Sequence, residues 1–121
     1  MYEANQFMVL NQFDVITTSV AETEDEQQPH TVRLYQNYPN PFNPETRIDF
    51  DLPQKATVTL AIYDLQGRPI RTLIHTEKAA GHYVAIWDSR TDSGDKAPSG
   101  VYVYRLTAGT HVSSKKMVLL K

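Results

Sequence analysis

Residues 46–64 read TRIDFDLPQKATVTLAIYD, and the alternation of side chains in this stretch decides the fold class. In the first half Ile48, Phe50 and Leu52 alternate with charged residues, and in the second half Val58, Leu60 and Ile62 occupy every other position. A period of two predicts a half-buried strand with one wet face. The PQKA between the halves is a turn signal, so the stretch predicts two consecutive strands.

The same period recurs downstream as far as the last residue. RPIRTLIH (68–75) is the weakest candidate strand, and HYVAIWD (82–88), GVYVYRLTAG (100–109) and HVSSKKMVLLK (111–121) are better ones. Turn sequences separate them, and none has a helical period. Six or seven short strands predict an all-β, immunoglobulin-like antiparallel β-sandwich of about seven strands. A closed barrel is the alternative, and it is disfavoured because the connections vary in length and one is long.

Residues 1–33 are expected to be an N-terminal segment and an acidic linker. FMVLNQFDVITTSV (7–20) is moderately apolar and fits either a strand pair or the end of an upstream domain. AETEDEQQPH (21–30) offers four acidic residues and nothing apolar to bury, which predicts a solvated linker. The folded domain is therefore predicted at 34–121.

The composition disfavours several classes of protein. The 121 residues include 12 basic and 14 acidic ones, scattered along the chain, and the net charge of -2 gives no pull toward nucleic acid. Without cysteine, neither a disulfide nor a thiolate metal site can form. The apolar runs are too short for a transmembrane segment, and the first ten residues lack the pattern of a signal peptide. If the protein is exported, we expect its signal peptide upstream and the chain to be a fragment.

A proline-rich segment directly precedes the strand at 46–52. We call residues 37–44, NYPNPFNP, the plug. Proline fixes φ and cannot donate to a ladder, so the plug is predicted to be stiff and to lie outside the sheets. Tyr38 and Phe42 are expected to anchor it across one end of the sandwich. The remaining residues are prolines that stiffen it and asparagines that hydrogen-bond its backbone, namely Pro39, Pro41, Pro44, Asn37, Asn40 and Asn43.

No catalytic constellation is recognisable. The four histidines have no metal-ligand spacing, and no nucleophile elbow or phosphate loop is present. Asp49 and Asp51 share one strand face, which is expected to be exposed and to leave their pKa values too low for a general acid. Trp87 is expected in the core rather than on a sugar-binding surface. We therefore predict neither an enzyme nor a cofactor.

One loop contains a weak candidate calcium site. Asp88, Asp92 and Asp95, together with Ser93, provide hard oxygen ligands within WDSRTDSGDKAPSG. Their spacing is not that of an EF-hand, and solvated turn residues are the alternative interpretation.

Five segments carry a resemblance to a known family, and they occur in the family's order. They are LYQNYPNPFNPETRIDFDLP, VTLAIYDLQGRPIRTL, AGHYVAIWD, SGVYVYRLTAG and the terminal KKMVLLK. Over residues 34–121 the chain resembles the C-terminal sorting domain, type A, of proteins exported by the type IX (Por) secretion system of Bacteroidetes-like bacteria. It also resembles in fold the immunoglobulin-like module of the flagellar hook-capping protein.

The resemblance implies a non-catalytic address that directs attached cargo across the outer membrane. Its partners would be the type IX translocon, a sortase and the cargo domain, with no nucleic acid and no transmembrane segment. The attached protein would be secreted or displayed at the cell surface by way of the periplasm.

Several matched positions have structural explanations. Asp64 and Gly67 are expected to form a hairpin turn with the glycine at positive φ. Gly100 is expected to relieve a tight strand start, and Tyr102 to pack on the sheet. Family members commonly place glycine after Trp-Asp, where this chain has Ser89, and the local turn geometry is in question there.

The last strand is the predicted contact for a receptor. Nothing downstream holds it, so it is expected to be the strand most available for edge pairing with a partner. Its lysines are equally compatible with a solubilising role on a sheet edge. The candidate contacts are Gly100, Tyr102, Lys115, Lys116, Met117, Val118, Leu120 and Lys121.

Two other functions remain open. An adhesion or carbohydrate-binding domain would need an exposed aromatic strip, for which Tyr83, Tyr102 and Tyr104 are the candidates. A structural domain would self-associate through its sheet edges.

Overall fold

The computed structural model describes residues 31–121, and the expectations for residues 1–30 lie outside this part of the chain. Within residues 31–121 there are seven strands and no helix, and hence no helix that could cross a membrane. The strands are β1 (Arg33–Leu34), β2 (Thr46–Leu52), β3 (Ala56–Asp64), β4 (Pro69–Lys78), β5 (Gly81–Trp87), β6 (Gly100–Ala108) and β7 (His111–Leu119).

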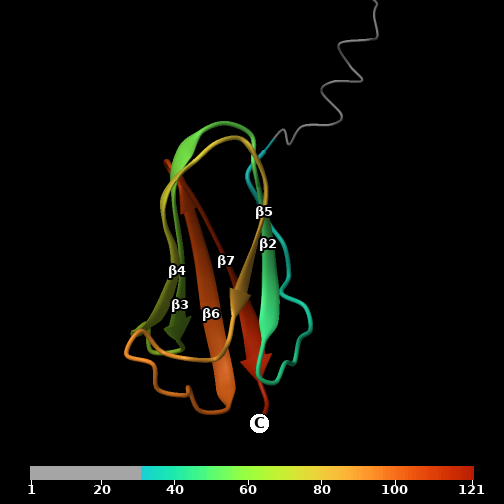
Figure 1. Cartoon of the computed structure of the whole chain (residues 1–121), viewed down its shortest axis with the longest axis vertical. Helices are drawn as coiled ribbons and strands as arrows, with labels where there is room; N and C mark the ends of the chain where they lie inside the picture. The colour runs from blue at the N-terminus through green and yellow to red at the C-terminus, as the bar shows by residue number, and fades with distance from the viewer. Residues whose placement is uncertain (1–30) are drawn as a thin grey trace, which may run out of the picture. The chain divides into compact units, whose positions relative to one another are not determined.

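The strands form two antiparallel sheets that pack face to face (Figure 1). One sheet has the order β1-β2-β5, and the other has the order β4-β3-β6-β7. The predicted immunoglobulin-like sandwich is confirmed, and the barrel alternative is wrong because the two sheets remain separate. The turn after Leu52 carries the chain from one sheet to the other, so β2 and β3 are not neighbours in a sheet.

Alternating residues of both sheets build the core, as the sequence pattern predicts. Ile48, Phe50 and Leu52 of β2 are fully buried, and Val58 and Leu60 of β3 face them with no exposed surface. Burying each such side chain stabilises the fold by about 1.5–3 kcal/mol.

β4 has the weakest alternation for a physical reason. Its pairing with β3 shifts register twice, between Leu60 and Ala61 and between Ile62 and Tyr63. A bulge inserts an unpaired residue and breaks the period of two. Ile70 and Leu73 of β4 fall at these shifts, and both are only partly buried.

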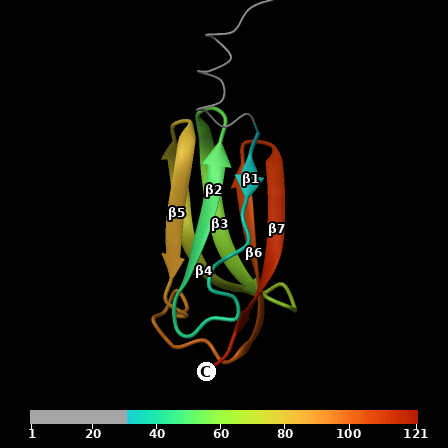
Figure 2. The same cartoon turned by 90° about the vertical axis from the view of Figure 1, so that its right-hand side faces the viewer.

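The two ends of the sandwich differ in what they present. Figure 2 places β1 near the upper end and the C-terminus at the lower end. The lower end gathers the plug, the turn after β3, the loop between β5 and β6, and the residues after β7. We call this the motif end, because every sequence segment that carries the family resemblance contributes residues to it.

Candidate functional site

The plug and the last strand are joined at the motif end. Phe42 forms a parallel β-bridge with Leu119. The Phe42 amide donates to the Val118 carbonyl at 3.0 Å, and the Leu120 amide donates to the Phe42 carbonyl at 3.0 Å. Asn40 Oδ1 accepts the Val118 amide at 2.9 Å. The expectation that the last strand is the one most available for edge pairing is therefore wrong for its C-terminal part, because the plug covers that edge.

Of the two expected plug anchors, one is confirmed and the other is wrong. Phe42 is 3% exposed, and its ring lies 5.8 Å from that of Trp87. Trp87 is fully buried, as predicted, and packs edge-on against Tyr102 at 5.3 Å. Tyr38 is instead 77% exposed. It bridges to Arg47 of β2, and bridge partners project from the same face, so Tyr38 lies on the wet outer face.

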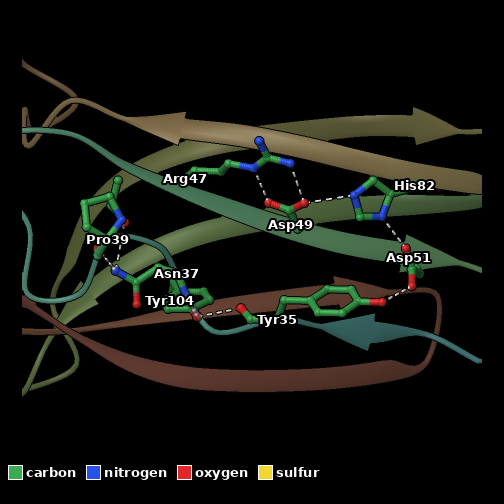
Figure 3. A network of polar contacts seen from close by, with 9 residues as sticks. Tyr35, Asn37, Pro39, Arg47, Asp49, Asp51, His82 and Tyr104 are labelled. Atoms are coloured by element: carbon green, nitrogen blue, oxygen red, sulfur yellow. Dashed lines mark hydrogen bonds and ion pairs between the residues drawn. The ribbon is translucent and has the colours of Figure 1, made fainter.

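Asn37 fixes the start of the plug. Its side-chain amide donates to the Thr46 hydroxyl at 2.9 Å and to the Pro39 carbonyl at 3.1 Å. Its backbone amide donates to the Tyr104 hydroxyl at 2.8 Å, which in turn donates to the Tyr35 carbonyl at 2.8 Å (Figure 3). Burial raises the pKa of Tyr104 to about 12. The predicted role of Asn37 is thus confirmed, whereas Asn40 bonds to β7 rather than to its own segment.

The turn after β3 has the predicted geometry. Asp64 Oδ1 accepts the backbone amides of Gln66 and Arg68 at 2.9 Å each, and Asp64 Oδ2 pairs with Arg68 Nε at 2.7 Å. Gly67 has φ of 86°, so the positive-φ glycine is confirmed. A side chain here would adopt a left-handed conformation that L-residues disfavour.

A groove brings two matched motifs together. It has a volume of about 490 Å³ and is lined by residues 64–66 and 68–70, from the turn after β3, and by residues 98–102, at the start of β6. The Tyr102 hydroxyl donates to the Pro98 carbonyl at 2.6 Å and shapes the wall. Apart from the adjacent residues, no atom lies within 4 Å of a Cβ added at Gly100, so the strand start is not crowded. Its φ of 158° is nevertheless one that L-residues rarely adopt, which agrees with the expected need for glycine there.

The candidate contacts on β7 divide by exposure. Met117 is fully buried, and Tyr102 on β6 is also buried, so the folded surface presents neither of them. Lys116, Leu120 and Lys121 are exposed, and Lys115 and Val118 are half-buried. Lys121 also lines a hollow of about 480 Å³ beside Asn43, with Arg90 and Lys96 on its wall.

The loop between β5 and β6 braces the sandwich rather than gathering ligands. Asp92 Oδ1 accepts the Thr72 amide at 3.1 Å, and Asp88 Oδ1 lies 3.4 Å from Arg71 Nη1. Asp95 Oδ2 accepts from the Ser93 hydroxyl at 3.4 Å. Within residues 31–121 no cluster of three or more acidic or histidine side chains is placed to hold a metal ion.

Ser89 adopts a glycine-like backbone conformation at the position where family members commonly have glycine. Its φ is 68°, the left-handed conformation for which glycine is best suited. The side chain is buried, and its hydroxyl donates to the Pro44 carbonyl. Ser89 thereby links the loop to the plug.

A charge network on the three-stranded sheet was missed by sequence reasoning. His82 of β5 contacts Asp51 Oδ1 through Nδ1 at 2.5 Å and Asp49 Oδ2 through Nε2 at 2.9 Å (Figure 3). Arg47 donates to both oxygens of Asp49, at 2.7 and 2.9 Å. The hydrogen bond from Arg47 lowers the pKa of Asp49. The face is therefore more enclosed than expected, although the expectation of unraised carboxyl pKa values is correct.

Sequence comparison identifies one matching family model. The model of the FlgD Ig-like domain matches residues 37–111. Comparison with curated protein sequences gives no match.

Among solved structures, dimeric latent PorU from Porphyromonas gingivalis superposes with a TM-score of 0.60 and 24% identity, over 74% of this chain and 9% of PorU. FlgD from P. aeruginosa superposes with a TM-score of 0.49 and 21% identity, over 61% of this chain and 57% of FlgD. PorZ is described as an essential surface component of the type-IX secretion system of Porphyromonas gingivalis. It superposes with a TM-score of 0.47 and 21% identity, over 86% of this chain and 13% of PorZ. The chain thus spans a small part of PorU, and that similarity concerns the fold.

Proposed function

The chain belongs to the FlgD Ig-like domain family, and from this premise and the five ordered motifs we propose that residues 34–121 are a non-catalytic sorting domain of type A. The domain directs an attached exported protein across the outer membrane through a type IX secretion system. Its partners are the translocon, a sortase and the attached cargo, and the cargo is released or displayed at the cell surface.

The convergence of the motifs at one end of the sandwich carries this proposal. Residues 37–44, 64–68, 87–88, 99–102 and 118–121 come from five separate segments of the sequence and meet at the motif end. A surface assembled from distant segments exists only in the folded domain. A receptor that binds this surface would therefore accept any cargo whose sorting domain has folded.

The direction of the chain supports the same function. The described chain begins near β1, at the end opposite the C-terminus (Figure 2). A cargo linked ahead of β1 would leave the motif end free for the translocon. Leu120 and Lys121 are the exposed side chains of the last segment there, and Lys116 is exposed earlier on β7. These three are the contacts that we propose.

The chemistry of the polar groups supports a non-catalytic role. The pKa values of Asp49 and Asp51 are lowered, so neither carboxyl holds a proton to donate near neutral pH. Both ring nitrogens of His82 are occupied by these carboxylates. The adhesion alternative requires an exposed aromatic strip. Tyr102 and Tyr104 are buried and cannot contribute to one.

A transport assay tests the proposal. A signal peptide and a fluorescent reporter are fused ahead of the whole chain, and the fusion is expressed in a host with a type IX system. Deleting the final seven residues is unsuitable as a test, because it removes Met117 and Leu119 from the core. Point substitutions on the surface separate recognition from folding.

Leu120→Ala and Val112→Ala form a matched pair for this assay. Both are aliphatic residues within 111–121, and their exposed fractions are 53% and 58%. Leu120 lies at the motif end, whereas Val112 lies near the opposite end of β7. We expect Leu120→Ala to reduce surface fluorescence and Val112→Ala to leave it unchanged, with both variants folded by circular dichroism. Periplasmic retention of the unsubstituted fusion would overturn the sorting function itself.

A further inference from the structure

His82 sits between two carboxylates that project from the same face of β2. The register pairs His82 with Asp51, and Asp49 lies two residues away on that strand. One ring nitrogen contacts Asp51 at 2.5 Å, and the other contacts Asp49 at 2.9 Å. The ring therefore ties the first part of β5 to β2 at two points.

This arrangement requires a proton on each ring nitrogen. An ionised carboxylate only accepts hydrogen bonds, and a neutral imidazole has a single N–H. With both nitrogens directed at carboxylates, a neutral ring would place a lone pair against an anionic oxygen. The geometry thus fits the imidazolium and not the neutral form.

Asp51 depends more than Asp49 does on His82 for a positively charged partner. Asp49 keeps the two-pronged bond from Arg47 whatever the state of the ring. Asp51 accepts the neutral Tyr35 hydroxyl at 2.5 Å. Arg33, which pairs with Asp51 in register, has its guanidinium over the Tyr35 ring at 5.0 Å.

Among residues 31–121, the remaining neighbours of His82 provide no further negative charge against the protonated ring. The Tyr35 ring meets the His82 ring edge-on at 6.0 Å. The next residue of β5, Tyr83, points to the other face of the sheet and holds Lys78 of β4 at 4.7 Å from its ring. Two carboxylates and one compensating guanidinium thus face the imidazole from β2.

We propose that His82 is a proton-operated clasp that fastens β5 to β2. With its proton, the ring satisfies both carboxylates and closes this part of the three-stranded sheet. Without it, the ring releases one carboxylate, the two negative charges on β2 lose their shared counterion, and the first part of β5 loosens. The clasp is independent of the sorting function and would make the stability of the domain depend on the pH of its surroundings.

The direction of the pH dependence follows from the contacts. The hydrogen bonds that the ring donates to Asp51 and then to Asp49 raise the pKa of His82 above its ordinary value of 6.5. A raised histidine pKa contributes stability that is complete below the unfolded pKa and is lost as pH rises through the folded one. For Asp51, burial opposes ionisation, but bonds from Tyr35 and His82 outweigh it and lower the pKa. The carboxylates lose their contribution as pH falls, so the clasp is strongest in mildly acidic solution.

The first experiment is an NMR titration of the histidine rings in the whole chain, with His82 assigned from His82→Gln. We expect His82 to titrate at a higher pH in the folded protein than in urea. We also expect Asp51→Asn to lower its midpoint more than Asp49→Asn, because Asp51 makes the shorter contact with the ring and the larger contribution to its raised pKa. Equal midpoints for folded and unfolded His82 would overturn the proposal.

A second experiment measures the consequence for the fold. Urea unfolding from mildly acidic to mildly alkaline pH should show stability falling as His82 loses its proton, with faster amide exchange in β5. His75→Gln is the matched control, because His75 contacts the uncharged Thr59 hydroxyl at 3.0 Å. The slope should persist in this control and disappear in His82→Gln. A slope unchanged in His82→Gln would contradict the clasp.

Discussion

Phe42 and Leu119 are partners in a parallel β-bridge, and both are buried. They come from opposite ends of the domain's sequence, since Phe42 lies in the plug ahead of β2 and Leu119 is the last residue of β7. The core is therefore closed at the motif end only when both termini of the domain are in place. The proline-rich segment holds an aromatic ring against Trp87 while its backbone covers an edge of the second sheet, and its prolines restrict the backbone that makes these contacts.

Phe42→Ala is expected to lower the free energy of unfolding by about 3–5 kcal/mol, because truncating a buried aromatic leaves a cavity. Urea denaturation followed by circular dichroism measures the loss. Tyr38→Ala is the matched control in the same plug, and its exposed ring predicts a change within about 0.5 kcal/mol. Comparable losses in the two variants would contradict the placement of the rings.

Deleting residues 115–121 is expected to abolish cooperative unfolding. The deletion removes the fully buried Met117 and Leu119 and leaves Phe42 without its bridge. Near-ultraviolet circular dichroism and a thermal melt provide the measurement. A sharp melting transition in the shortened chain would mean that the C-terminal part of β7 is dispensable for folding, and this part would then be free to act as a detachable signal.

Much of the fold follows from local sequence patterns. The alternation around Phe50 places the core strands correctly, and the prediction for Gly67 holds because a tight turn imposes its own residue preferences. Trp87 is buried because a small sandwich gains so much from covering an indole. The alternation and the turn depend on neighbours within a few residues, and the burial of Trp87 follows from its size, which is why the sequence alone predicts these features.

The errors concern contacts between distant segments. Tyr38 was expected inside because it is aromatic, but its bridge to Arg47 turns it toward solvent. His82 meets Asp49 and Asp51 only through the register of β5 on β2, and no local pattern specifies which strands will be neighbours. The alternating charges of β2 were the one available signal, since an unbalanced pair of carboxylates on one face calls for a cation opposite.

Asn37→Ala is expected to lower stability by about 1–3 kcal/mol, because it removes two buried hydrogen bonds that contribute about 0.5–1.5 kcal/mol each. The bonds run to the Thr46 hydroxyl and the Pro39 carbonyl, which remain bonded to each other at 2.9 Å. Asn43→Ala is the matched control, since its side chain is exposed in the same plug. Chemical denaturation of the two variants gives the comparison, and a neutral Asn37→Ala would argue against a structural role for the buried amide.

Ser89 permits a test of backbone strain against hydrogen bonding. Ser89→Ala should lose about 1 kcal/mol, because the Pro44 carbonyl loses its donor while the backbone stays left-handed. Ser89→Gly loses the same bond but relieves a left-handed conformation that costs about 1–2 kcal/mol for an L-residue. Thermal melts should therefore rank Ser89→Gly above Ser89→Ala. The reverse order would indicate that the loop adjusts its backbone once the hydroxyl is gone.

Tyr104 should make the domain unstable in alkaline solution. The unfolded chain releases the phenol proton near pH 10, whereas burial holds the folded pKa at about 12. Between these values the folded state binds more protons, so stability falls as pH rises. Tyr104→Phe should flatten this fall, although the loss of its bonds to Asn37 and Tyr35 lowers stability at neutral pH. Urea unfolding at several alkaline pH values measures the slope, with exposed Tyr38→Phe as the control. An identical slope in Tyr104→Phe and the unsubstituted chain would mean that another group controls alkaline unfolding.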